Sequence, residues 1–138
     1  FADLNRAGFY SRWLTYGQSK VANLFFSYEL QRRLQAAGHD TLATAAHPGW
    51  ARTNLMQYSW TARWFGPLLA QGPEAGAAPT LRAATDLQAT PGSYYGPRWF
   101  EMRGPAVKVS STRYSRRVDV AARLWAVSQK LTGLSFLS

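Results

Sequence analysis

The order of segments in the first third of the sequence restricts the fold of this chain more than any other feature. Residues 13–37 carry apolar side chains at spacings of three and four, which predicts a long helix, and Gly38 is placed to end it. The stretch 41–46 is short, apolar and compatible with a buried strand, and Pro48 and Gly49 stop it. Helix, glycine turn, strand and loop in this order are typical of an α/β protein with a parallel sheet.

The later segments continue this alternation less clearly. We expect a short aromatic helix or lid near residues 58–65, and then a helix over 73–86 that starts at Pro73 and packs through small residues with Leu81 and Leu87. A brief strand should follow a turn at 90–97, and residues 98–112 should be irregular with a short extended piece at 106–109. A last helix over 117–131 should end at Gly133. Only two of these segments are convincing strands, and a parallel sheet needs more neighbours to bury both faces. We therefore expect residues 1–138 to form a single partial domain of a larger α/β fold.

Composition excludes several classes of function. The 138 residues include no cysteine and only two histidines, without a carboxylate cluster, so thiolate metal sites are excluded and a metal-centred mechanism is disfavoured. No apolar run approaches the roughly 20 residues of a membrane span, and no secretory signal is visible; we expect a cytoplasmic location. The net charge of +9 leaves a nucleic-acid surface open as an alternative. Because the cations are scattered along the chain, we expect no nucleic-acid partner.

Tyr16 and Lys20 form the candidate catalytic pair. Residues four apart on a helix share a face, with Cβ atoms roughly 5–6 Å apart. A protonated Lys20 near the Tyr16 hydroxyl would favour the phenolate and lower the tyrosine pKa from its reference value near 10. A tyrosine tuned in this way can exchange a proton with an alcohol or carbonyl oxygen. Taken alone, however, the spacing favours a pair of side chains on a solvated helix surface.

Several stretches, in order along the chain, resemble the short-chain dehydrogenase/reductase family. "TYGQSKVANLFFSYELQRRL" resembles the family's active-site helix, where Tyr-x-x-x-Lys is followed by Ala-Asn-Leu, and it is most similar to the retinol-dehydrogenase-like and protochlorophyllide-reductase-like branch. "HPGWARTNL" resembles the Pro-Gly loop after the next strand, while "PEAGAAPTLRAATDL", "GSYYGP" and "RLWAVSQKLTG" resemble the helix, strand and closing helix that follow. The resemblance implies the C-terminal portion of a Rossmann-like doubly wound parallel sheet, with the N-terminal dinucleotide-binding half missing from the chain.

The same resemblance implies an oxidoreductase that uses NAD(P), with NADP against NAD undecided. Tyr16 would act as acid/base on a carbonyl or alcohol substrate, and Lys20 would lower its pKa and bond the nicotinamide ribose. The Pro-Gly turn would bring the chain against the nicotinamide ring, and Thr53 would bond the carboxamide or a phosphate. The implied cofactor-binding residues are Tyr16, Lys20, Pro48, Gly49, Trp50 and Thr53.

Aromatic residues after the turn form a weaker candidate. Tyr58, Trp60 and Trp64 would line the substrate side and favour an apolar substrate. Ordinary packing and an amphipathic membrane-surface patch are the alternatives for this stretch. His47, directly before the turn, is interpreted as a strand-end residue and not as a catalyst.

Two parts of the family's pattern are not in this sequence. No glycine-rich stretch could hold a pyrophosphate at a helix N-terminus, and no serine stands at a suitable place ahead of Tyr16, so we expect the catalytic serine upstream of Phe1. We therefore expect the 138 residues to be inactive alone and assign activity to the intact parent. The alternative is a catalytically inactive remnant or an interaction module, with helix 13–37 as the surface of a possible homodimer.

Overall fold

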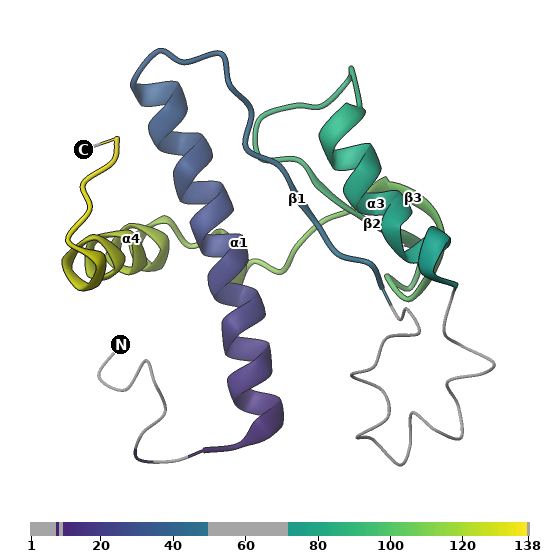
Figure 1. The fold of residues 1–138 in the computed structure, drawn as a ribbon, viewed down its shortest axis with the longest axis horizontal. Helices are drawn as coiled ribbons and strands as arrows, with labels where there is room; N and C mark the ends of the chain where they lie inside the picture. Colours follow the sequence, from purple (N-terminus) through teal and green to yellow (C-terminus); the bar gives the residue numbers. More distant parts are fainter. Residues whose placement is uncertain (1–7, 9, 50–71, 138) are drawn as a thin grey trace. The chain divides into compact units, whose positions relative to one another are not determined.

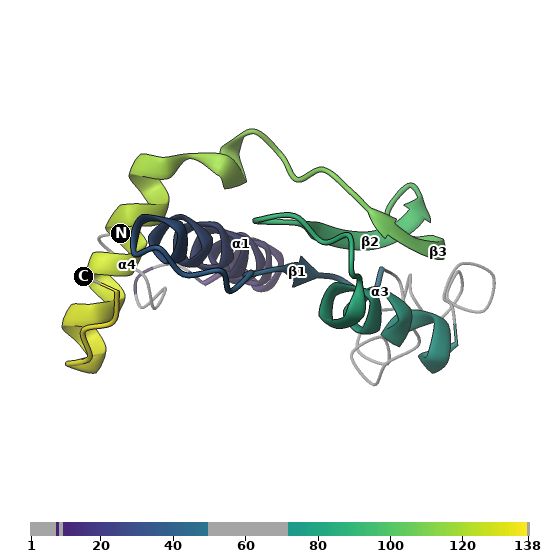
Figure 2. The ribbon, with the colours of Figure 1, turned by 90° about the horizontal axis from the view of Figure 1, so that it is seen from above.

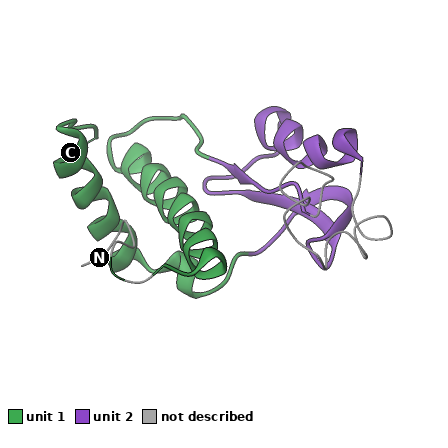
Figure 3. Ribbon diagram, turned by 60° about the horizontal axis from the view of Figure 1, so that its bottom comes forward, with its two compact units in different colours: residues 1–43, 111–138 green, residues 44–110 purple. Residues whose placement is uncertain are grey.

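The computed structural model describes residues 8, 10–49 and 72–137 (Figure 1). The chain forms two compact units, of which unit 1 comprises residues 1–43 and 111–138 and unit 2 comprises residues 44–110 (Figure 3). The elements in chain order are α1 (Arg12–Ala36), β1 (Ala45–Ala46), α3 (Pro73–Thr85), β2 (Tyr94–Trp99), β3 (Arg103–Lys108), the 3₁₀ helix η2 (Tyr114–Arg116) and α4 (Val118–Thr132). The mixed α/β class is thus confirmed, whereas a single partial domain over 1–138 stays a prediction.

Helix α1 ends as the sequence predicted. Gly38 adopts a left-handed φ of +73°, which glycine tolerates because it has no Cβ. The N–H of His39 donates to the carbonyl of Leu34 at 2.9 Å, and the N–H of Gly38 donates to that of Gln35 at 3.1 Å. This pair of bonds is a Schellman motif, and it satisfies carbonyls that the end of the helix would otherwise leave open.

The core of unit 1 forms where α4 packs on α1 (Figure 2). Phe25 and Leu34 of α1 and Ala121 and Trp125 of α4 are its buried apolar side chains. The ring of Tyr114 in η2 meets Phe25 edge-on, with 5.5 Å between the centroids. Aromatic pairs of this geometry add to the stabilisation that burial alone provides.

Two polar residues of α1 are buried. Gln31 is only 4% exposed, and its Oε1 accepts the N–H of Ala43 at 2.7 Å. Glu29 is also buried and pairs with Arg32 and with Arg33, whose Nε lies 2.7 Å from Glu29 Oε1. Both side chains satisfy the rule that a buried polar group needs a partner.

Unit 2 is a three-stranded sheet in the order β1-β2-β3. β1 pairs parallel with β2, in the register Ala45 opposite Tyr94, and β2 pairs antiparallel with β3. Residues 98–112 are therefore not irregular as expected, since they contain the second strand of a hairpin. An antiparallel edge strand on an otherwise parallel sheet is common in α/β folds.

Helix α3 lies against this sheet and begins as predicted, with Pro73 at its first position and Glu74 in its first turn (Figure 2). The expected packing face was wrong. Its buried residues are Gly76 and Pro79, whereas Leu81 is 63% exposed and Leu87 is fully exposed. The sheet thus meets Gly76 and Pro79, whereas Leu81 lies on the open side of the helix and Leu87 follows the end of the helix.

Candidate active site

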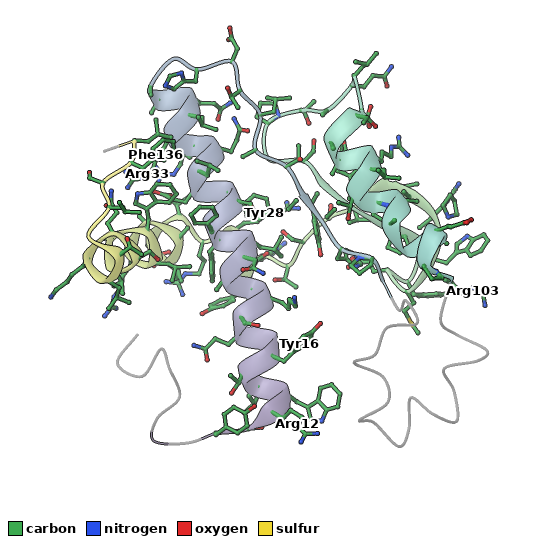
Figure 4. All side chains as sticks on the ribbon, in the orientation of Figure 1. Arg12, Tyr16, Tyr28, Arg33, Arg103 and Phe136 are labelled. Atoms are coloured by element: carbon green, nitrogen blue, oxygen red, sulfur yellow. The ribbon has the colours of Figure 1, made fainter. Side chains whose placement is uncertain are left out.

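Tyr16 lies near the N-terminal end of α1 (Figure 4), and Lys20 follows it by about one turn; both residues are exposed. The Lys20 ammonium lies over the Tyr16 ring, with its Nζ 5.3 Å from the ring centroid, and Tyr16 is 45% exposed. Ser19 between them donates its hydroxyl to the Tyr16 carbonyl at 2.7 Å, which agrees with a structural role. The helix thus presents a phenol and a cation side by side on its exposed face.

The Pro-Gly turn lies in unit 2, at the carboxyl end of β1. β2 runs parallel to β1, so the carboxyl ends of both strands meet at this edge. In open α/β sheets, ligands bind beyond the carboxyl ends of the strands. The position of Pro48 and Gly49 is therefore the one that a ligand-binding turn requires.

Gly49 is held tightly by the β2–β3 hairpin. Its φ of +67° is left-handed, and a Cβ at this position would lie 2.5 Å from the Met102 carbonyl oxygen and 2.6 Å from Pro97 Cγ. Only glycine fits there without displacing the hairpin.

His47 connects β1 to this turn. Its N–H donates to the Tyr95 carbonyl at 3.0 Å, which continues the pairing of β1 with β2. Its Nδ1 accepts the N–H of Gly49 at 3.2 Å, and its Nε2 lies 3.5 Å from Oε2 of Glu101. Burial lowers the pKa of His47 below its ordinary value, and the nearby Glu101 carboxylate opposes this shift.

Sequence reasoning missed the contacts around this imidazole. Gly96 lies directly beneath it, since a Cβ on Gly96 would fall 2.1 Å from His47 Nε2. The sequence shows a histidine before Pro-Gly, but Gly96 and Glu101 become its neighbours only through the strand register.

The predicted site residues are distributed over both units. The structure places Tyr16 beside Lys20 in unit 1, and Pro48 beside Gly49 in unit 2. The remaining predicted site residues, Trp50, Thr53, Tyr58, Trp60 and Trp64, lie outside the described residues, as does the aromatic helix expected near 58–65.

Two kinds of feature are absent from the part of the chain that the structure describes. Among residues 8, 10–49 and 72–137, no three His, Asp or Glu side chains are grouped so that they could hold a metal ion. Over the same ranges, no helix has the length and apolar character that crossing a membrane requires.

Comparison with known proteins agrees with the motifs. No family model matches the chain. It is 35% identical to human (Homo sapiens) retinol dehydrogenase 13, in an alignment that covers 97% of this chain and 41% of that protein. It is 32% identical to the polyprenol dehydrogenase of Mus musculus, over 96% of this chain and 39% of that protein. The crystal structure of an uncharacterized protein from Mycobacterium paratuberculosis is 44% identical and superimposes with a TM-score of 0.77, over 98% of this chain and 45% of the other.

These matches show the fold of the chain and the family branch that it resembles. The α/β elements and the matched regions are those of a partial Rossmann-like domain. Over nearly its whole length the chain then aligns with retinol dehydrogenases, so the resemblance to that branch of the short-chain dehydrogenase/reductase family is confirmed. The chain spans about two fifths of the length of the curated relatives that it matches.

Proposed function

We propose that this chain forms part of an NAD(P)-dependent oxidoreductase that transfers a hydride between a nicotinamide cofactor and an apolar carbonyl or alcohol substrate. The observation that carries the proposal is the exposed Tyr16–Lys20 pair, in a stretch that aligns with named dehydrogenases. The named relatives act on retinol and on polyprenol according to their names, which supports an apolar alcohol as the substrate class.

The roles of the two side chains follow from their chemistry. The Tyr16 hydroxyl would give a proton to the substrate oxygen during reduction and take one during oxidation. The Lys20 ammonium lies over the Tyr16 ring, 5.3 Å from the ring centroid, and so places a positive charge beside the phenol.

The residues that are present suit a nicotinamide cofactor. An exposed ammonium has three donors for ribose hydroxyls, and the Pro48–Gly49 turn lies beyond the carboxyl ends of parallel strands, where such ligands bind. The cofactor, when bound, supplies and accepts the hydride. Lys20 and the turn would bind and orient it, and Trp50 and Thr53 are proposed as further contacts.

The test begins with the genomic DNA upstream of the Phe1 codon, which gives the full reading frame to express. In that full-length protein we expect Tyr16→Phe to lower kcat by at least about a hundredfold, since acid–base groups contribute about 10²–10⁴ in rate, while cofactor still binds. Tyr10→Phe is the matched control, because Tyr10 is an exposed tyrosine just ahead of the same helix. Activity of Tyr16→Phe within about twofold of the parent would refute the assignment.

A second candidate is an interaction module, and exposed apolar side chains favour it. Trp13 is 71% exposed and Leu14 is 58% exposed, both in the first turn of α1. Homodimer formation through this helix predicts that Trp13→Gln with Leu14→Gln shifts sedimentation of the full-length protein toward monomer. A cofactor-free protein whose association depends on these two residues would favour the module over the enzyme.

A further inference from the structure

The imidazole of His47 is fixed from several sides, and the proposed reaction does not use it. It accepts from Gly49 through Nδ1 and lies against the Tyr94 ring, with 5.2 Å between the centroids. Gly96 beneath it leaves no room for a Cβ. Such enclosure restricts the ring to one orientation, so its two nitrogens have fixed directions.

The hydrogen bond to Gly49 determines where the proton of the imidazole lies. A backbone N–H can only donate, so Nδ1 must offer its lone pair. The imidazole is therefore neutral, with its proton on Nε2. That nitrogen is buried, and within the described part of the chain it has no hydrogen-bond partner closer than the Glu101 carboxylate at 3.5 Å.

The turn that carries Glu101 is itself unusual. Phe100 and Glu101 have φ values of +53° and +57°, and Met102 donates its N–H to the Trp99 carbonyl at 3.0 Å. This is the backbone of a type I′ turn, which favours Asn and Gly and disfavours bulky side chains. Strained residues persist where their surroundings hold them, and they cluster at functional sites. Here the turn brings the Glu101 carboxylate toward His47 and the Met102 carbonyl against Gly49.

We propose that His47 is a positioning residue for the Pro48–Gly49 turn: as a neutral imidazole it fixes the Gly49 amide through Nδ1, while Glu101 faces its Nε2–H. The inference rests on the proposed function, because that turn is the one expected against the nicotinamide. Protonation of Nδ1 would replace the acceptor by a second donor facing the Gly49 N–H. The turn is thereby released in acid, and cofactor binding weakens with it.

The groups that face the imidazole act in opposite directions. Burial disfavours the charged form, and the Glu101 carboxylate favours it. The Tyr94 ring contributes an apolar face. The position of the acid transition therefore depends on Glu101, and Glu101→Gln should move it to lower pH.

The experiment compares three substitutions in the full-length protein. His47→Asn keeps an acceptor near the position of Nδ1, His47→Gln keeps a polar group near Nε2 only, and His47→Phe keeps only the ring. We expect His47→Gln and His47→Phe to raise the KM for the nicotinamide cofactor about three- to tenfold, the effect of one lost hydrogen bond, with kcat nearly unchanged. His47→Asn should restore the KM, which a purely structural role in packing the ring would not predict.

A second readout does not depend on activity. Long-range ¹H–¹⁵N NMR correlations of the wild-type imidazole should show Nδ1 unprotonated and Nε2 protonated at neutral pH, and the Gly49 amide should exchange faster in His47→Gln than in His47→Asn. A proton on Nδ1 at neutral pH, or equal exchange in both variants, would overturn the inference even if cofactor binds. Absence of cofactor binding by the wild-type protein would instead refute the proposed function, and with it the role of the turn in cofactor affinity.

Discussion

Replacing Gly49 by alanine should separate the cost of a left-handed backbone from the cost of a steric overlap, which usually occur together. Gly38, Gly49 and Gly133 have similar left-handed φ values of +73°, +67° and +70°. A Cβ at Gly38 or Gly133 would meet no atom within 4 Å, whereas at Gly49 it would meet the Met102 carbonyl and Pro97. Gly38→Ala and Gly133→Ala are therefore matched controls that share the backbone cost and lack the overlap.

The expected magnitudes follow from these distances. A left-handed backbone costs a residue with a Cβ about 1–2 kcal/mol, and the reduced freedom of the unfolded chain returns about 0.4–1 kcal/mol. Both contributions are common to the three variants. A contact of 2.5 Å with a backbone oxygen cannot be relieved by a rotamer change. Overpacking of this kind costs a further ~1–3 kcal/mol. We expect Gly38→Ala to destabilise by about 1 kcal/mol and Gly49→Ala by about 2–4 kcal/mol.

Amide hydrogen exchange measures each unit separately. The N–H of Val109, bonded to the Tyr94 carbonyl at 2.8 Å, reports the opening of the sheet, and the N–H of His39 reports the end of α1. Gly49→Ala should reduce protection at Val109 far more than Gly38→Ala reduces it at His39. Equal losses, within about 0.5 kcal/mol, would show that the hairpin does not press on the turn, and the reasoning from the overlap would be wrong.

Three further predictions concern charge and strain. Glu29→Gln should lower the free energy of unfolding of unit 1 by about 1–3 kcal/mol in urea titrations followed by circular dichroism, because it removes a buried acceptor from Arg32 and Arg33. Because the pKa of His47 is lowered in the folded state, the unfolded chain binds a proton at this imidazole first as the pH falls. The free energy of unfolding should therefore decrease from pH 6.5 down to the folded pKa of His47 and then level off. His47→Phe should abolish this contribution. Phe100→Asn should stabilise unit 2 by up to about 1 kcal/mol in thermal melts, because Asn tolerates the left-handed turn and the exposed Phe100 ring loses no packing; a lower Tm for this variant would count against strain in the turn.

Local signals were sufficient for the helices of this chain. The spacing of apolar residues and the glycines at 38 and 133 located α1 and α4, since a left-handed C-cap is a property of a few neighbouring residues. Pro73 and Glu74 did the same for the start of α3. The proximity of Tyr16 and Lys20 also required only helical spacing, and the structure places the Lys20 ammonium over the Tyr16 ring.

Features that depend on distant partners could not be predicted. The hairpin at 99–103 has no Asn-Gly signal, because its left-handed residues are Phe100 and Glu101. Gln31 resembles a solvated residue until the chain returns at Ala43 to bond it. Periodicity likewise assigned Leu81 to the packed face of α3, since it counts every apolar residue as core, whereas the sheet meets Gly76 and Pro79.

The surroundings of Trp125 give unit 1 an optical reporter of its own. The indole is 5% exposed, stacks on Phe26 with 5.2 Å between the centroids, and carries the Arg33 guanidinium 4.9 Å above its ring. A buried indole emits at shorter wavelength than a solvated one, and the emission changes when a charge near the ring moves. Arg33 is in turn held by Glu29 and by the Leu137 carbonyl. In a variant whose five other tryptophans are replaced by phenylalanine, the emission wavelength of Trp125 should therefore report whether the Leu137 carbonyl stays bonded to Arg33.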